Sequence, residues 1–74
     1  GEVRRLVTTL HDQTLGRREL QSRLMLKSQA NFRDRYLEPA LAAGVLEMTI
    51  PDKPNSRLQK YRLTAAGKRL LPQP

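Results

Sequence analysis

The sequence predicts an α+β fold of the winged helix-turn-helix type, with a three-helix core, a small antiparallel β-hairpin and a short C-terminal helix. Two observations predict it. Apolar residues recur at helical spacing before residue 44, which indicates three consecutive helices. The run from Met48 to Thr64 then has the pattern strand, basic loop, strand and helix cap. That layout is typical of a wing, a hairpin whose tip can lie on a nucleic-acid backbone.

The first half of the chain predicts two helices and a short strand between them. An amphipathic helix is expected over residues 2–10, on the apolar positions Val3, Leu6, Val7 and Leu10. Leu15 is a lone apolar residue after a break, so we expect a short edge strand there. Gly16 is an acceptable N-cap for a second helix over residues 17–25, in which Leu20 and Leu24 lie one turn apart.

A third helix is predicted over residues 29–43, with Ser28 as its N-cap and Gly44 after its C-terminus. One side of its helical wheel is apolar, with Phe32, Tyr36, Leu37, Ala40 and Leu41. Pro39 in a helix interior would cost about 3 kcal/mol and disfavours the α conformation of the preceding residue. We therefore expect a kink or break at Leu37–Glu38, with Pro39 as the first residue of a final turn.

The second half predicts the hairpin and a last helix. A half-buried strand is expected over residues 46–50, where Leu46, Met48 and Ile50 alternate with polar residues. Lys53-Pro54-Asn55-Ser56 is a turn signal, and Pro51, Pro54, Asn55 and Ser56 together should set a particular loop shape. The strand over residues 59–63 should return with Tyr61 and Leu63 facing in and Lys60 and Arg62 facing out. Thr64 should cap a helix over residues 65–71.

Length and composition limit the function classes. The chain has 74 residues, which suits one domain over residues 1–71 with a tail at 72–74. It begins with Gly1 rather than Met, so we expect a piece of a longer protein. There is no cysteine for a disulfide or thiolate metal site, and no apolar run approaches the roughly 18 residues of a membrane span. We expect a cytoplasmic protein with no membrane partner.

The positive charge is concentrated late in the chain. Fourteen basic and seven acidic residues give a net charge of +7. Residues 51–74 hold six basic residues and one acidic residue, which gives +5 for that third of the chain. Such a balance favours acidic partners such as nucleic acid or anionic lipid, although a merely soluble basic surface is an alternative.

Enzyme chemistry has little support in these residues. His11 is the sole histidine, and no nucleophile, base and orienting group can be assembled around it. Without a Cys/His cluster or a glycine-rich loop, neither zinc nor a phosphate-bearing cofactor has a recognisable site. The three aromatic residues fit core positions, which argues against base stacking on a single strand. We expect a non-enzymatic module with no cofactor and no metal.

Two groups of residues are candidates for contacts with duplex DNA. The third helix of a winged helix presents its polar face to the major groove, and here that face offers Ser28, Asn31 and Arg35. Gln29, at the start of the same helix, is a further candidate for a DNA contact. Asp34 and Glu38 share the face and would repel phosphates, so a solvated helix face is the alternative. The second group would contact the phosphate backbone of the DNA, and we call it backbone-directed. It comprises Lys53, Asn55, Arg57, Lys60 and Arg62 around the wing, with Arg17 and Arg18 at the second helix. Ordinary exposed arginines, and lysines that keep an edge strand unpaired, are the alternative there.

Several segments also resemble a known family. They are residues 31–33, 36–41, 43–44 and 47–64, and together they resemble the C-terminal domain of Fic-type proteins over most of residues 16–67. A similar tail ends many bacterial ATP-binding proteins of the divergent AAA class, often labelled transcriptional regulators or RecG-like helicases. The most specific part is the wing sequence Pro51-Asp52-Lys53-Pro54. Met25 is a departure, since the family often has glycine there.

The resemblance implies a winged helix at the C-terminus of a multidomain bacterial protein that binds DNA, and it carries no catalytic residue into this chain. Our first hypothesis is therefore a DNA-binding module that regulates or targets a larger protein. The alternative is a protein-interaction or dimerisation module, docking on the parent's catalytic domain or on another copy of itself.

Overall fold

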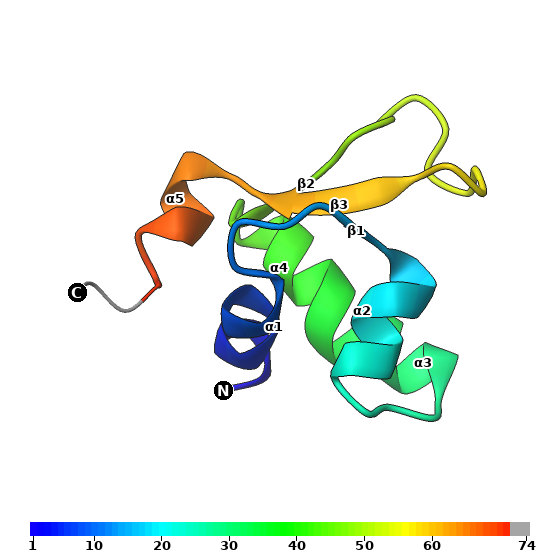
Figure 1. The fold of residues 1–74 in the computed structure, drawn as a ribbon, viewed down its shortest axis with the longest axis horizontal. Helices are drawn as coiled ribbons and strands as arrows, with labels where there is room; N and C mark the ends of the chain where they lie inside the picture. Colours follow the sequence, from blue (N-terminus) through cyan, green and yellow to red (C-terminus); the bar gives the residue numbers. More distant parts are fainter. Residues whose placement is uncertain (72–74) are drawn as a thin grey trace.

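The computed structural model describes residues 1–71, in which a helical layer packs under a small antiparallel sheet (Figure 1). The elements are α1 (Glu2–Leu10), β1 (Leu15–Gly16), α2 (Arg17–Arg23), α3 (Gln29–Phe32), η1 (Arg33–Leu37), α4 (Glu38–Ala42), β2 (Leu46–Met48), β3 (Lys60–Leu63) and α5 (Ala65–Lys68). The predicted α+β class and winged-helix arrangement are confirmed. The expected tail at 72–74 lies outside the described residues.

The sheet has three strands in the order β1-β3-β2, so the returning strand of the wing is central. Leu15 pairs with Tyr61 in antiparallel register, and Leu46 pairs with Leu63. The predicted edge strand at Leu15 is therefore present. Tyr61 and Leu63 are buried, as their parity predicts, because alternate residues of a strand face the same side.

The core lies between the sheet and the helices. Its buried apolar side chains come from every helix except the last and from all three strands: Leu6, Val7, Leu10, Leu15, Leu20, Leu24, Phe32, Tyr36, Leu37, Ala40, Val45, Leu46, Tyr61 and Leu63. Burial of one such large side chain contributes about 1.5–3 kcal/mol. The faces predicted from helical periodicity in the first three helices are the faces that pack here.

A kink or break was expected at Leu37–Glu38, with Pro39 opening a final turn. The helix does not break there, but its hydrogen bonding is irregular just before Glu38, and Pro39 does lie in the first turn of α4. α3, η1 and α4 follow one another without interruption, and Glu38 keeps α-helical dihedral angles, with φ −64° and ψ −44°. The adjustment occurs one turn earlier, where η1 is a turn of π-helix and the Glu38 N–H donates to the Arg33 carbonyl five residues back. A π-turn changes the hydrogen-bond register within a helix. Pro39, which has no N–H to donate, thus falls in the first turn of α4, where such a donor is dispensable.

The second helix is shorter than predicted and ends in a left-handed residue. α2 stops at Arg23, Leu24 is its C-cap, and Met25 has φ 60°. A left-handed conformation costs a non-glycine residue roughly 1–2 kcal/mol. The glycine that resembling sequences often have at this position would adopt this conformation freely. Gly44, with φ 74°, fills the same role after α4, as predicted.

The last helix begins where predicted and ends early. The Thr64 hydroxyl accepts a hydrogen bond from the Gly67 N–H, so the predicted cap is present. The helix was expected to reach residue 71 but is α-helical only to Lys68. Beyond it, Leu70 and Leu71 donate to carbonyls three residues back, which is the tighter pattern common at helix ends. No helix within residues 1–71 combines the length and apolar character needed to span a bilayer.

Candidate nucleic-acid interface

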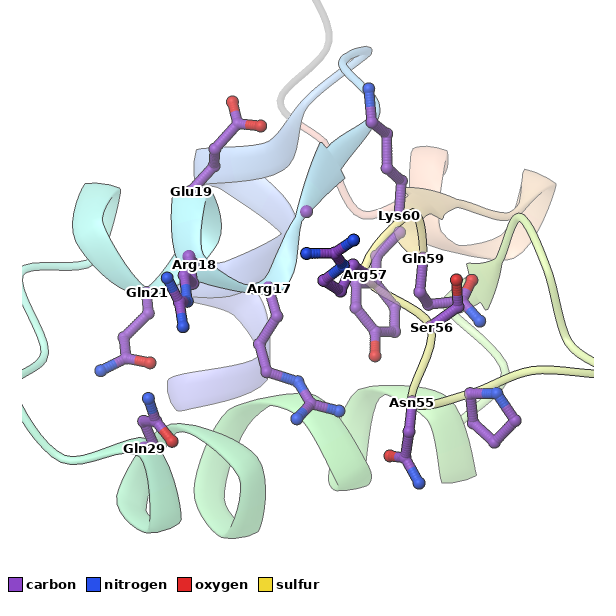
Figure 2. A pocket seen from close by; sticks show the side chains of 13 residues that line it. Arg17, Arg18, Glu19, Gln21, Gln29, Asn55, Ser56, Arg57, Gln59 and Lys60 are labelled. Carbon is purple, nitrogen blue, oxygen red and sulfur yellow. The ribbon is translucent and has the colours of Figure 1, made fainter.

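A cleft of about 640 Å³ lies between the start of α2 and the wing (Figure 2). Its position follows from the sheet register. Gly16 pairs with Lys60, so the strand that leads directly into α2 is bonded to the strand that returns from the wing. This pairing brings residues distant in sequence to two sides of one hollow. The side chains that line it include Arg17, Arg18, Glu19, Gln21, Gln29, Asn55, Ser56, Arg57, Gln59, Lys60 and Tyr61.

Four cationic side chains of the cleft have no acidic partner within residues 1–71. Ion pairs in that part of the chain join His11 to Asp12, Arg33 to Asp34 and Arg62 to Glu47. None of them uses the cations that we call the cleft cations, which are Arg17, Arg18, Arg57 and Lys60. Figure 2 shows the first two on α2 and the other two on the wing side. With Glu19 as the one acidic lining residue, the cleft has a charge of +3.

Six of the eleven predicted site residues line the cleft, namely Arg17, Arg18, Gln29, Asn55, Arg57 and Lys60. The other five, Ser28, Asn31, Arg35, Lys53 and Arg62, lie outside it. Gln29, a candidate for a DNA contact at the start of the third helix, contributes to the wall beside Arg18 and Gln21. The structure therefore assembles the backbone-directed group more completely than the base-reading group.

The polar face of the third helix is partly engaged in its own structure. The Ser28 hydroxyl accepts a hydrogen bond from the Asn31 N–H at 3.1 Å, as the predicted N-cap. Arg33 donates to Asp34 at 3.0 Å, and this bond raises the pKa of the Arg33 guanidinium. Residues 29–42 contain two basic and two acidic residues, so the net charge of this helix is zero. It gives no net attraction to a phosphate backbone.

Arg62 is also partly engaged. Its Nε donates to Glu47 Oε1 at 2.9 Å across the β2–β3 pair, where the two residues are in direct register. Oppositely charged residues at such positions stabilise a sheet modestly. The outward direction predicted for Arg62 is confirmed, but its charge is balanced locally.

The wing is held by a series of turns and by the side chains of Ser56 and Gln59. Ser56 N–H donates to the Lys53 carbonyl at 3.0 Å, which confirms the predicted turn. Lys53 N–H bonds to the Ile50 carbonyl, and Gln59 N–H bonds to the Ser56 carbonyl. The loop therefore has a defined path between the strands, and Arg57 and Asn55 are presented from it.

Gln59 is the main residue that sequence reasoning missed. It was predicted only as the first residue of the returning strand, yet it is buried and its amide bonds to Ile50 and Lys53 on the opposite arm of the wing. A signal existed in the parity: Gln59 has the same alternation as Tyr61 and Leu63, which places a polar residue on the inward face. Glu19 and Gln21, two further lining residues, had no such signal.

His11 lies at the C-cap of α1, the helix end at which it was expected. Its Nδ1 is 3.2 Å from the Asp12 carboxylate, and this hydrogen bond is the largest cause of a lowered pKa of Asp12. Both side chains are exposed, and neither lines the cleft. Within residues 1–71 no group of three or more His, Cys, Asp or Glu side chains is arranged to hold a metal ion.

Comparison with known proteins identifies the family. The profile described as "Filamentation induced by cAMP protein Fic-like, C-terminal domain" matches residues 1–64. The chain belongs to the Fic-like C-terminal domain family. A crystal structure of a Fic family protein from Desulfovibrio desulfuricans G20 is 36% identical and superposes with a TM-score of 0.82. The superposition covers 86% of this chain and 20% of that protein, so the Fic-like domain corresponds to about a fifth of its length. No curated protein matches.

All lining residues of the cleft fall within the segment that the family profile matches. α5 begins at Ala65, after that segment. The cleft thus lies within the matched segment, and α5 lies at the opposite end of the sheet (Figure 1).

Proposed function

We propose that this Fic-like C-terminal domain binds duplex DNA through its phosphate backbone and so targets or regulates a larger bacterial protein. The observation that carries the proposal is the α2–wing cleft, which gathers four cations without acidic partners. Arginine and lysine bind phosphate oxygens, and each phosphate neutralised releases a condensed counterion. That release supplies most of the affinity in sequence-independent DNA binding.

The distribution of charge favours backbone contacts over base reading. The cleft carries +3, whereas the third helix, which would enter the major groove of a typical winged-helix complex, is neutral. Asp34 and Glu38 on its exposed side would oppose close approach to a polyanion. We therefore propose binding with little sequence preference, in which Ser28, Asn31 and Arg35 are not the principal contacts.

A binding role also agrees with the chemistry of the chain. The one histidine is committed to the exposed pair with Asp12 and is not among the residues that line the cleft. We propose that any catalysis by the larger protein takes place outside residues 1–71, whether that protein is Fic-type or an ATP-binding, helicase-like regulator.

The test is a titration of the domain against a labelled duplex of arbitrary sequence at several salt concentrations. If all four cleft cations contact phosphate, the slope of log affinity against log salt is about −3.6, from about 0.9 per contact. Affinity then falls roughly 150-fold between 50 and 200 mM salt. A scrambled duplex should bind equally well. A dissociation constant weaker than about 1 mM at 50 mM salt would reject the proposal.

A second candidate is docking on another protein surface, such as the rest of the parent protein or a second copy. The observation in its favour is Leu58, a large apolar side chain that is 74% exposed on the wing. Single exposed apolar residues are common, so this observation is the weaker of the two. Sedimentation of the domain alone and with the parent's remaining domains distinguishes the candidates. Under the docking proposal Leu58→Ser abolishes association and leaves any DNA binding unchanged.

A further inference from the structure

Gln59 is the one buried polar side chain among residues 1–71, with 5% of its surface exposed. It lies at the base of the wing and forms part of the cleft wall. Its Oε1 accepts from the Ile50 N–H at 2.8 Å, and its Nε2 donates to the Lys53 carbonyl at 2.9 Å and also to the Ile50 carbonyl. A buried amide keeps its place only when its donors and acceptors are paired, and here they are.

These bonds stand where strand pairing stops. β2 ends at Met48, and the last backbone bond between the two arms joins Thr49 N–H to the Lys60 carbonyl at 2.9 Å. Beyond that point Ile50 is bonded to the side chain of Gln59 rather than to the backbone of the returning arm. The predicted strand over 46–50 is shorter than expected for this reason. Gln59 substitutes for the missing pair of the ladder.

We infer that Gln59 is a positioning residue for the anion site. It fixes the wing so that Arg57 and Asn55 are held across the cleft from Arg17. The inference rests on the proposed function for its binding readout, but the fixing of the wing is a property of the free domain. Gln59 itself contacts no phosphate in this scheme and acts only through the path of the loop.

The packing of the core does not involve the hydrogen bonds between Gln59 and the wing. No member of the buried apolar core comes from residues 50–58, and the β3 pairings involve residues 60–63. Loss of the Gln59 bonds should therefore free the loop without unfolding the domain. That separation allows a positioning role to be told apart from a general structural one.

The experiment compares Gln59→Met, which has a similar length and shape without the amide, with Gln21→Met as the matched control. Gln21 also lines the cleft, but its amide makes a single hydrogen bond, to the Leu26 carbonyl at 3.1 Å, and none to a wing residue. The first measurement is ¹⁵N relaxation of the free 74-residue chain. Order parameters of residues 52–58 should fall from about 0.85 to below about 0.6 in Gln59→Met and stay unchanged in Gln21→Met.

The second measurement is a pair of double-mutant cycles for duplex binding at about 0.1 M salt. Arg57→Ala alone should weaken binding about five- to tenfold, as expected for one lost phosphate contact. In the Gln59→Met background Arg57→Ala should have almost no further effect, because Arg57 is no longer held in place. Arg17→Ala should keep its full effect in both backgrounds, since α2 does not depend on the wing.

Gln59→Asn provides a second variant, because it retains an amide on a side chain that is shorter by one methylene and cannot bond to Ile50 and Lys53 together. In this background too, Arg57→Ala should have almost no further effect on duplex binding. A wing as ordered as in the unmodified chain, or a full independent effect of Arg57→Ala in either variant, would overturn the inference. Absence of duplex binding by the unmodified chain would reject the proposed function only, and relaxation would still decide whether Gln59 fixes the wing.

Discussion

Removal of two cleft charges should weaken the salt dependence of DNA binding far more than removal of two charges elsewhere. The test pair is Arg17→Ala with Arg57→Ala, one from each side of the cleft. The control pair is Arg62→Ala with Arg69→Ala, both exposed and both outside the cleft. Each pair lowers the net charge from +7 to +5, since two of the excess positive charges are removed. A response to overall charge alone would be the same in both.

The expected magnitudes follow from the number of free cations in the cleft. Four phosphate contacts give a slope of about −3.6, and loss of two leaves about −1.8. Between 50 and 200 mM salt the affinity of the unmodified domain and of the control pair falls roughly 150-fold, whereas that of the cleft pair falls only about 12-fold. The control should be stable, because an exposed pair such as Arg62 with Glu47 contributes about 0–1 kcal/mol.

Fluorescence anisotropy with a labelled duplex of about 15 base pairs measures these slopes directly. Circular dichroism melts of all variants check that none is unfolded. Equal slopes for the two pairs would refute the assignment of the cleft as the interface. If the control pair reduced the salt slope more than the cleft pair did, the interface would lie on the opposite part of the sheet.

Three further predictions concern stability. Gly67→Ala should lower the melting temperature by about 4–8 °C per kcal/mol, at a cost of about 1–3 kcal/mol, because a Cβ there would lie 2.1 Å from the Val45 carbonyl oxygen. Met25→Gly should raise the free energy of unfolding by about 1 kcal/mol in a denaturant melt, since it relieves a left-handed conformation and loses a side chain that is 84% exposed. Asp12→Asn should destabilise the domain slightly at about pH 5 and not at about pH 2, because the pKa of Asp12 is lowered in the folded state and its contribution is lost as pH falls through that value.

Each of these has its own contradictory outcome. The control for Gly67→Ala is Ala66→Gly, at an exposed position of the same helix, which should cost about 1 kcal/mol from helix propensity alone. A Gly67→Ala variant as stable as the unmodified chain would show that α5 shifts to accommodate the methyl group. A Met25→Gly variant that is less stable would mean that chain entropy outweighs strain at this turn. A pH-independent effect of Asp12→Asn would assign the contribution to something other than the His11 hydrogen bond.

The sequence predicted the elements well because their signals are periodic. The spacing of Leu6, Val7 and Leu10 follows directly from the geometry of a helix that packs one face, and α1 begins and ends where that spacing predicts. Caps are also local, and the Ser28 and Thr64 hydroxyls make the bonds their positions predict. Both kinds of signal depend on residues within one or two turns of each other.

The third helix shows where such rules stop. The prediction at Pro39 assumed that the residues before it keep the α hydrogen-bond register, in which an interior proline clashes with the preceding turn. The π-turn at Arg33–Leu37 does not keep that register, and the helix continues through Pro39. Nothing in residue type distinguishes a π-turn from a break, since both relieve the same clash. In the continuous form Tyr36 and Leu37, both within the π-turn, are buried in the core.

The site could be predicted as a set of residue types but not as an assembly. Arg17, Arg57 and Lys60 were singled out by charge, yet only the Gly16–Lys60 register brings them to one cleft. Strand register depends on pairings between distant segments and is invisible to local patterns. The same limit explains why Arg62 was grouped with the cleft residues: its partner Glu47 is adjacent only once β2 and β3 are paired.

The specific wing sequence now has an explanation that requires no protein partner. Phosphate contact alone would be satisfied by any few lysines on a flexible loop. Here the Lys53 carbonyl accepts from both the Ser56 N–H and the Gln59 amide, an arrangement that requires a fixed turn between them. Proline and asparagine in that turn favour the required dihedral angles. The wing residues that are not required for phosphate contact instead determine the shape of the loop. The particular sequence of the wing therefore supports a preorganised site for the DNA backbone as strongly as it supports a surface for docking another protein.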